Sequence, residues 1–441
     1  MMEKVFTSPS LNNVRKVLEL MKTKIFIVFI QTLVYLISNQ FIYAQSESIS
    51  DNDIIWLKSI IHPLKTFDPT IENTEDLEIL GQLVGDKKIV ALGEVTHGSS
   101  EIFKMKHRII KYLNKQHNFD IFSMEAAMPE ADRLNEYILD GKGNPTELIR
   151  GMHFWILCNQ EVLDLVEWMR LENQNGHPIK FCGFDMQYYE GAIENLKNGF
   201  KYDSKITQTI DELNDTLNLY KLRSNMPIIG FVSEQQENTV NQFLKKIEQE
   251  VNLKNFGKSE KEWLLRNLRI IEQSIKDYPW EREKYMAENF EWITKQNPNS
   301  KFIIWAHNSH VMRTNHHETL LPMGGYLSND FKEDYLNIGF AFYKGSYTAL
   351  SHNKIEIQTA EEAENGSYEY IFYQLQEPLF LIDLREIRDN NSLQTQLFKN
   401  ALKFRTVGAV KTREFEEKDI LKDYDLLIFI AESTNAIQMK Y

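Results

Sequence analysis

The stretch KIVALGEVTHGSS, residues 88–100, joins a short apolar run to a polar turn that is bracketed by glycines. Similar apolar runs recur along the chain, and long amphipathic stretches separate them. This alternation is typical of parallel strands with helices between them. The sequence therefore predicts an α/β fold with a largely parallel central sheet flanked by helices.

The same pattern predicts the positions of further elements. Strands are expected at residues 88–92, 120–124, 179–184, 302–306, 336–342, 379–384 and 426–431, and helices at 100–116, 129–139, 160–173 and 281–295. Between about residues 200 and 280 the apolar residues are spaced three and four apart, without a strand-like run. This spacing predicts an all-helical insertion, which acts either as a lid over a cleft or as a structural pad.

The amino-terminal region has the parts of an export signal. Lys22 and Lys24 precede an apolar run at residues 25–37, and a short segment ends at Ala44. The run is shorter than the roughly 20 residues of a membrane span. We interpret residues 21–44 as a signal peptide, 1–20 as an upstream extension and 45–441 as the mature domain, with an uncleaved anchor helix as the alternative. We expect an exported protein, periplasmic or secreted, with no stable membrane span after cleavage.

Charge and cysteine content narrow the functional classes. The formal net charge of −13 argues against a nucleic-acid partner, because phosphate binding requires clustered Lys and Arg. The chain has only two cysteines, Cys158 and Cys182, and their spacing matches no zinc motif. Two buried thiols or one disulfide both remain open.

Acidic side chains and histidines follow several predicted strands directly. Ligands of parallel α/β sheets bind outside the carboxyl ends of the strands. A single acidic residue or histidine after a strand more often caps a helix or lies in a solvated turn than belongs to a functional site. Their coincidence predicts a shared site formed by Glu94 and His97 after the first strand, Glu125 and Asp185 after the next two, and His307 and His310 after the fourth.

His97 has the setting of a general base. Gly93 and Gly98 bracket a strand-to-helix turn, where the positive end of the helix dipole favours a neutral imidazole. A neutral histidine can take a proton from water, and Glu94 or Glu125 on its other nitrogen would fix the tautomer. A structural hydrogen bond across the turn is the alternative.

Missing motifs narrow the reaction class. The chain contains no G-x-S-x-G nucleophile elbow, no S-x-x-K set, no H-E-x-x-H zinc helix and no G-x-x-x-x-G-K-[ST] phosphate loop. Ser99 and Ser100 follow His97, but they are typical of residues that start a helix. These features favour direct attack by an activated water.

With these residues in view, the chain resembles the erythromycin esterase family from about residue 87 through 310, and more loosely to its end. The resemblance implies a hydrolase that opens the lactone ester of 14-membered macrolides such as erythromycin and so confers antibiotic resistance. It also implies that His97 acts as the base on water. The resemblance rests on residues 92–98, Phe103, Lys106, Arg108, 124–126, 135–138, 168–170, Asn173, 183–187, 282–289 and 305–311.

The resemblance also implies a set of site residues. The positions that match other parts of the family's active centre are Glu94, Glu125, Arg282, His307 and His310. Lys106 stands where the family has an arginine, and we expect Lys106 and Asp185 to bind substrate. Arg282 would stabilise an oxyanion or position the substrate. A salt bridge to Glu94, Glu125 or Asp185 is the alternative, and the two roles are compatible at different stages of the reaction.

Two other functions use the same residues. The implied reaction involves only a macrolide and water, with no cofactor. The imidazoles and carboxylates are also a plausible divalent-metal set, which would make the protein a metal-dependent hydrolase of another ester or a phosphoester. A third reading is an exported binding protein that holds a hydrophobic ligand beneath the helical insertion.

Overall fold

The computed structural model describes residues 49–221, 232–276, 281–314, 320–389, 397–398, 400–411 and 414–439. The predicted signal peptide and the extension before it lie outside these residues. From Asp51 onward the described residues form one unit. Across these ranges, no helix has both the length and the apolar character that a membrane crossing requires.

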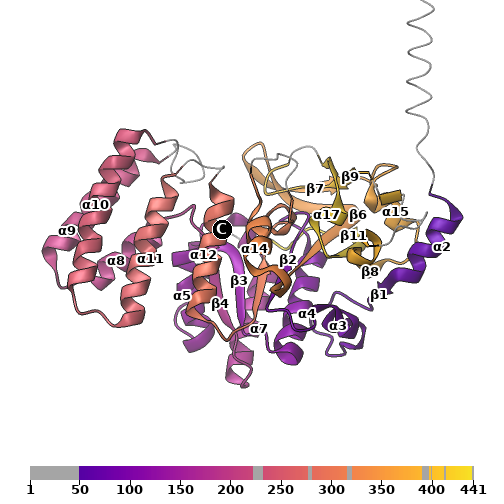
Figure 1. Ribbon diagram of the computed structural model, residues 1–441, viewed down its shortest axis with the longest axis horizontal. Helices are drawn as coiled ribbons and strands as arrows, with labels where there is room; N and C mark the ends of the chain where they lie inside the picture. The colour runs from indigo at the N-terminus through magenta and orange to yellow at the C-terminus, as the bar shows by residue number, and fades with distance from the viewer. Residues whose placement is uncertain are drawn as a thin grey trace, which may run out of the picture. The chain divides into compact units, whose positions relative to one another are not determined.

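A nine-stranded sheet forms the centre of this unit (Figure 1). Its spatial order is β1-β8-β11-β6-β2-β5-β3-β4, and β7 pairs with the far part of β6. The strands are β1 (Ile61–Pro63), β2 (Ile89–Leu92), β3 (Ile121–Ala127), β4 (Lys180–Asp185), β5 (Phe302–Trp305), β6 (Tyr335–Ser351), β7 (Lys354–Ala360), β8 (Leu379–Asp383) and β11 (Leu426–Ser433). A separate two-stranded sheet pairs β9 (Leu402–Arg405) with β10 (Phe415–Lys418).

The central strands run parallel, which confirms the predicted fold class. β2 lies between β5 and β6 and is parallel to both, and β3 is parallel to both β5 and β4. Among the described strands of the nine-stranded sheet, the antiparallel pairs are β1 with β8, β8 with β11, and β7 with β6. The carboxyl ends of β2, β3, β4 and β5 therefore meet at one edge of the sheet.

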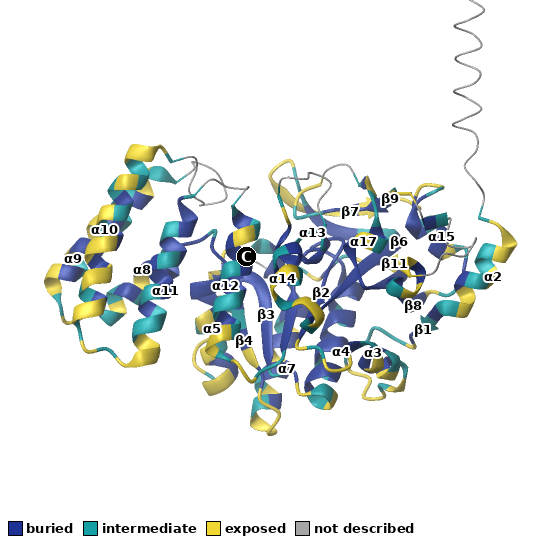
Figure 2. Ribbon diagram, viewed as in Figure 1, coloured by how far each residue is buried: buried dark blue, intermediate teal, exposed yellow. Residues whose placement is uncertain are grey.

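Burial explains why the central strands consist mostly of apolar residues. Every residue of β2, β3, β5 and β8 is buried (Figure 2). Helices cover both faces of such a sheet, so neither face alternates with polar residues. A charged residue at the end of one of these strands is consequently held at the boundary of the core.

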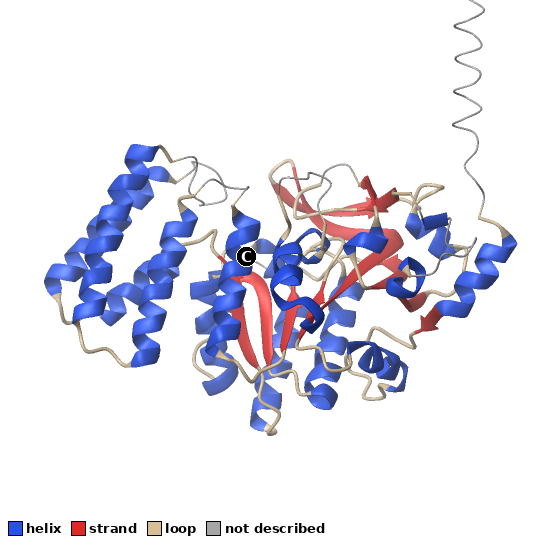
Figure 3. Cartoon of the chain, in the orientation of Figure 1, coloured by secondary structure: helices blue, strands red, loops and turns tan. Residues whose placement is uncertain are grey.

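Helices surround the sheet (Figure 3). Near the amino end, α2 (Asp51–Ile60) precedes β1, and α3 (Glu78–Val84) precedes β2. Helix α7 (Gln160–Gln174) contacts both α4 (Ser100–His117) and α5 (Met128–Asp140), and α6 (Pro145–Gly151) contacts α5 and α7. Helix α12 (Arg282–Gln296) contacts β4 and α14 (Met323–Phe331), and α13 (Asn308–Val311) contacts α14 and β6. Shorter helices α15 (Tyr368–Tyr373), α16 (Leu384–Arg388) and α17 (Ile420–Asp423) accompany the last strands.

The described residues around the expected insertion form helices joined by short loops, apart from a bridge residue at Lys221. The helices are α8 (Glu190–Gly199), α9 (Ser204–Tyr220), α10 (Glu234–Leu253) and α11 (Lys258–Ser274), which pack side by side at one end of the sheet (Figure 1). A capping box at Ser233 and Gln236 begins α10, and its buried positions repeat at helical spacing.

The largest difference from the predicted elements lies in β6. It was expected to end at residue 342, but it continues to Ser351 because its second half pairs with β7. Strand β7 has no counterpart among the predicted strands, and most of its residues are exposed. A mostly exposed strand such as β7 lacks the buried apolar run by which the other strands were recognised.

Candidate active site

The turn after β2 lies very close to other backbone segments. A Cβ atom on Gly98 would come within 2.1 Å of the Thr348 carbonyl oxygen, and one on Gly93 would come within 2.2 Å of Asn308 Oδ1. Gly93 also donates its N–H to Ile338, which extends the pairing of β2 with β6. The two glycines are required for this close approach, and they fix where the residues between them point.

The two serines after the turn start helix α4, as the sequence predicts. Ser99 is the N-cap and accepts a hydrogen bond from the Ile102 N–H at 3.3 Å. Ser433 donates its hydroxyl proton to Ser99. Ser100 donates to Glu161 at 2.5 Å. Both hydroxyls therefore have structural partners.

His97 and Glu94 form a buried pair within the turn. His97 Nδ1 lies 2.6 Å from Glu94 Oε1, and the two residues are 5% and 3% exposed. The ionised Glu94 carboxylate accepts a hydrogen bond from the Nδ1–H group, so the lone pair of the neutral imidazole lies on Nε2. Of the two carboxylates expected on the other nitrogen of His97, the structure places Glu94 there.

Lys106 supports this pair from helix α4. Its Nζ lies 2.8 Å from Glu94 Oε2 and 4.0 Å from the centre of the Trp305 ring. Burial lowers the pKa of Lys106 to about 8, against the attraction of the Glu94 carboxylate. Burial alone would disfavour the Glu94 carboxylate, but Lys106 and His97 outweigh it and hold its pKa below the usual value.

A second charged group joins the ends of β3 and β4. Arg282, the first residue of α12, donates from Nη2 to Glu125 Oε1 at 2.8 Å and from Nε to Asp185 Oδ2 at 3.1 Å. Its Nη2 also contacts Asp185. Arg282 therefore forms the salt bridges to Glu125 and Asp185 that the sequence left open.

His310 extends this group toward α12. Its Nε2 lies 3.2 Å from Glu125 Oε1, and its Nδ1 lies 2.7 Å from Glu283 Oε1. Burial opposes the imidazolium, but the Glu125 and Glu283 carboxylates raise the pKa of His310 to about 10. Burial also disfavours the Glu125 carboxylate, yet His310 and Arg282 hold its pKa well below the usual value. His310 is therefore a cation at neutral pH. Glu125 contacts both His310 and Arg282, and Arg282 Nη1 lies 3.2 Å from His310 Nε2.

His307 connects the two groups and is neutral. Its backbone N–H donates to Glu125 Oε2 at 3.1 Å, and its ring centre lies 5.0 Å from that of His97. Burial, with His97 and His310 nearby, lowers the pKa of His307 to about 3. Its Nδ1 accepts from the Ser309 N–H, and its Nε2 lies 3.3 Å from the Val95 carbonyl. The neutral ring thus holds the turn that carries His97.

The family-model comparison matches residues 115–433, described as erythromycin esterase. The chain belongs to the erythromycin esterase family. The matched range contains Glu125, Asp185, Arg282, His307 and His310. Glu94, His97 and Lys106 lie before its first residue. This family member is accordingly a hydrolase. Its charged site combines residues that lie before residue 115, where the family match begins, with residues inside the match.

Individual proteins and solved structures are similar to this chain. The erythromycin esterase type II of Escherichia coli is 25% identical over 362 residues, which span 73% of this chain and 83% of that protein. A crystal structure of a Bacillus cereus protein is 26% identical, with a TM-score of 0.77 over 89% of this chain and all of that one. A mutant of the erythromycin esterase EreC in its open conformation shares the fold, with a TM-score of 0.65 and 18% identity over 83% of this chain and 96% of that one.

All eight predicted site residues lie in the two connected groups. Lys106 and Asp185 were expected to bind substrate, but both are fully buried and pair with charged protein groups. Contact of either with substrate stays a prediction. Glu283 was missed as a member of the site, although it directly follows Arg282 in the family motif.

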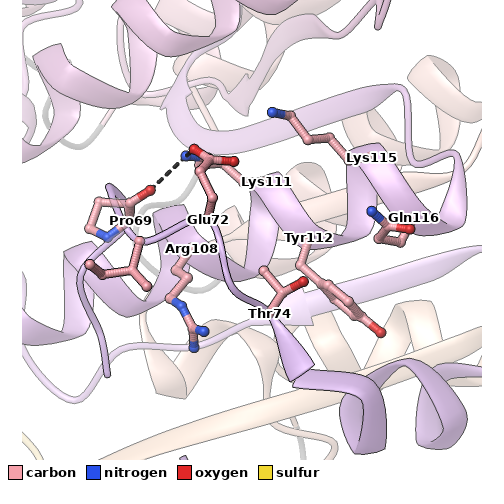
Figure 4. Close-up of a pocket in the computed structure, with 9 residues that line it drawn as sticks. Pro69, Glu72, Thr74, Arg108, Lys111, Tyr112, Lys115 and Gln116 are labelled. Carbon is pink, nitrogen blue, oxygen red and sulfur yellow. Dashed lines mark hydrogen bonds and ion pairs between the residues drawn. The ribbon is translucent and has the colours of Figure 1, made fainter. Parts of the chain in front are cut away.

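Two further features lie apart from this family site. A pocket of about 70 Å³ lies between residues 69–74 and α4, where Lys111 bonds to the Pro69 carbonyl (Figure 4). It contains none of the predicted site residues. Cys158 and Cys182 are both free thiols, and burial raises the pKa of Cys182 to about 12, which makes it a poor nucleophile.

Proposed function

We propose that this family member hydrolyses the lactone ester of 14-membered macrolides such as erythromycin, using a water molecule activated by His97. The proposal rests on the 2.6 Å contact between His97 Nδ1 and Glu94, which directs the basic lone pair to Nε2. Family membership and the relative named erythromycin esterase type II support the substrate class. The activity would confer macrolide resistance.

In this mechanism His97 Nε2 takes a proton as the water oxygen attacks the lactone carbonyl carbon. The tetrahedral intermediate carries the negative charge on the former carbonyl oxygen. Collapse breaks the ring C–O bond, and the imidazolium of His97 returns the proton to the leaving alkoxide. The products are a carboxylic acid, which ionises, and an alcohol on one opened chain.

The two carboxylates next to the base have separate roles. Glu94 stabilises the His97 imidazolium, and Lys106 keeps Glu94 ionised. Glu125 holds Arg282 and His310 together, and we assign these two cations to the developing oxyanion. His307 positions the turn without taking up a proton.

We further propose that the reaction uses no resident metal ion. Glu94 is engaged by His97 and Lys106, and Glu125 by Arg282, His310 and the His307 N–H. Binding a divalent ion there would require breaking these buried ion pairs, which is costly. Full activity after chelator treatment supports the proposal, and loss that is restored by metal contradicts it.

Export is a separate proposal, which rests on the sequence of residues 21–44 alone. The mature protein would act outside the cytoplasm, in the periplasm or after secretion. Amino-terminal sequencing of the protein from the extracytoplasmic fraction should begin at Gln45. An uncleaved amino end in the membrane fraction would contradict this proposal.

The substrate proposal is tested by mass spectrometry. Purified protein incubated with erythromycin should produce the ring-opened compound, heavier by one water, and His97→Ala should abolish it. A His177→Ala variant, which changes an exposed histidine, serves as a control. Unchanged erythromycin after prolonged incubation with the wild type would contradict the substrate proposal, and tight binding without product would favour a binding protein.

A further inference from the structure

A second group of possible ligands lies just beyond the same strand ends. Glu130 is in the first turn of α5, which follows β3, and Glu190 begins α8, which follows the turn after β4. His153 lies shortly after α6. One ligand atom from each side chain lies within 4.8 Å of the others. Within the described ranges, this is the only such group of His, Cys, Asp and Glu.

One of the two carboxylate oxygens of Glu130 has no hydrogen-bond partner. The side chain is 4% exposed, and its Oε1 accepts the Gly191 N–H at 2.7 Å. The same Oε1 lies 3.8 Å from His153 Nε2. The second oxygen, Oε2, is buried and has no hydrogen-bond partner. An unpaired buried carboxylate oxygen is costly, and a bound cation would satisfy it.

Glu190 supplies a second carboxylate on the more exposed side. Its Oε2 accepts the Tyr189 N–H at 3.2 Å, and its Oε1 pairs with Lys221 Nζ at 2.6 Å. Lys221 already places a positive charge beside this carboxylate. A cation bound by the group would compete with the Lys221 ammonium for Glu190.

His153 completes the group and selects the class of cation. Its ring centre lies 4.8 Å from that of Tyr188, which packs against it. Two carboxylates alone would suit Mg²⁺ or Ca²⁺, whereas an imidazole shifts the preference toward Zn²⁺. Ligand atoms that share a tetrahedral zinc ion are about 3.3 Å apart. The 3.8 Å separation of His153 Nε2 and Glu130 Oε1 is close to that spacing.

We propose that Glu130, His153 and Glu190 bind one Zn²⁺ ion at the start of α5 and α8. The two carboxylates neutralise the ion, and the imidazole supplies the third ligand. Three protein ligands leave a tetrahedral position for water. None of the three belongs to the group around His97, so this site is independent of the proposed ester hydrolysis.

Titration calorimetry with ZnCl₂ on the chelator-treated full chain tests the site. One equivalent of Zn²⁺ should bind, with Mg²⁺ as the weaker comparison ion. His153→Ala and Glu130→Gln should each weaken Zn²⁺ binding by at least about 10- to 100-fold, because loss of a residue that only supports a ligand already costs this much. Glu130→Gln keeps an acceptor for the Gly191 N–H, so the local fold is retained.

Two further variants separate this site from other zinc-binding positions. Lys221→Met should tighten binding because it removes the ammonium that competes for Glu190, whereas His177→Ala should bind as the wild type does. The absence of saturable Zn²⁺ binding would overturn the proposal. Binding that survives His153→Ala, or that disappears in His97→Asn, would overturn it as well by placing the ion elsewhere.

Discussion

Replacing Glu94 with glutamine tests the geometry of the proposed base. The amide can donate to His97 Nδ1, which moves the imidazole proton to Nε2 and leaves no lone pair there for water. A wrong tautomer in a comparable histidine pair costs about 10⁴-fold in kcat. We therefore expect Glu94→Gln to lose about three to four orders of magnitude in the rate of ester hydrolysis.

The same change has a cost in stability. Lys106 is fully buried, and its ammonium would lose the carboxylate 2.8 Å away. Removing one partner of a buried ion pair destabilises a protein by about 3–5 kcal/mol. The free energy of unfolding from urea denaturation at pH 7 should fall by this order in Glu94→Gln.

A double variant separates the two effects. Lys106→Met, combined with Glu94→Gln, removes the unpaired charge while keeping an apolar chain beside Trp305. Its free energy of unfolding should return most of the way to the wild-type value, while its activity stays lost. A folded Glu94→Gln protein with nearly wild-type kcat would refute the assigned role of Glu94, and so would activity that returns together with stability.

Three other changes have measurable outcomes. The folded-state pKa of His310 is about 10, above its unfolded value near 6.5, so its contribution to stability is complete below pH 6.5 and falls as the pH rises toward 10. Between pH 6.5 and 8, the unfolding free-energy difference between wild type and His310→Asn should shrink by at most about 2 kcal/mol, and a constant difference would contradict this. Gly98→Ala should lower the free energy of unfolding by about 1–3 kcal/mol, because the added Cβ would collide with the Thr348 backbone. The control Gly151→Ala, whose Cβ would meet open space, should change it little. Equal melting temperatures of the two variants would contradict this. Arg282→Lys keeps the positive charge but loses the planar guanidinium, which bonds to Glu125 and Asp185 together. We therefore expect kcat/KM to fall at least about tenfold, and an unchanged value would contradict the assigned role of Arg282.

The sequence predicted the central part of the fold well because these strands are buried on both faces. The expected strand at 302–306 corresponds to Phe302–Trp305, and the expected strand at 379–384 to Leu379–Asp383. In contrast, β7 was not predicted, because most of its residues are exposed, although it pairs with the end of β6 that directly precedes it in the chain. Exposed strands of this kind carry little local signal.

The site was predictable as a set of residues, but its pairing was not. Position after a strand indicated that Glu94 and Glu125 lie at one edge of the sheet. Which of them contacts His97 depends on the path of the turn, which Gly93 and Gly98 determine through contacts with distant segments. The burial of Lys106 could also not be predicted from the sequence, since a lysine on an amphipathic helix is normally exposed.

The rate of erythromycin ring opening in His97→Gln, measured against wild type at pH 7.5, tests the central claim most directly. The glutamine is close in size but cannot accept a proton from water. The proposed mechanism predicts a fall in kcat of at least about 10²-fold, which is the lower range for loss of a general base. A correctly folded His97→Gln enzyme that opens the lactone at the wild-type rate would contradict it.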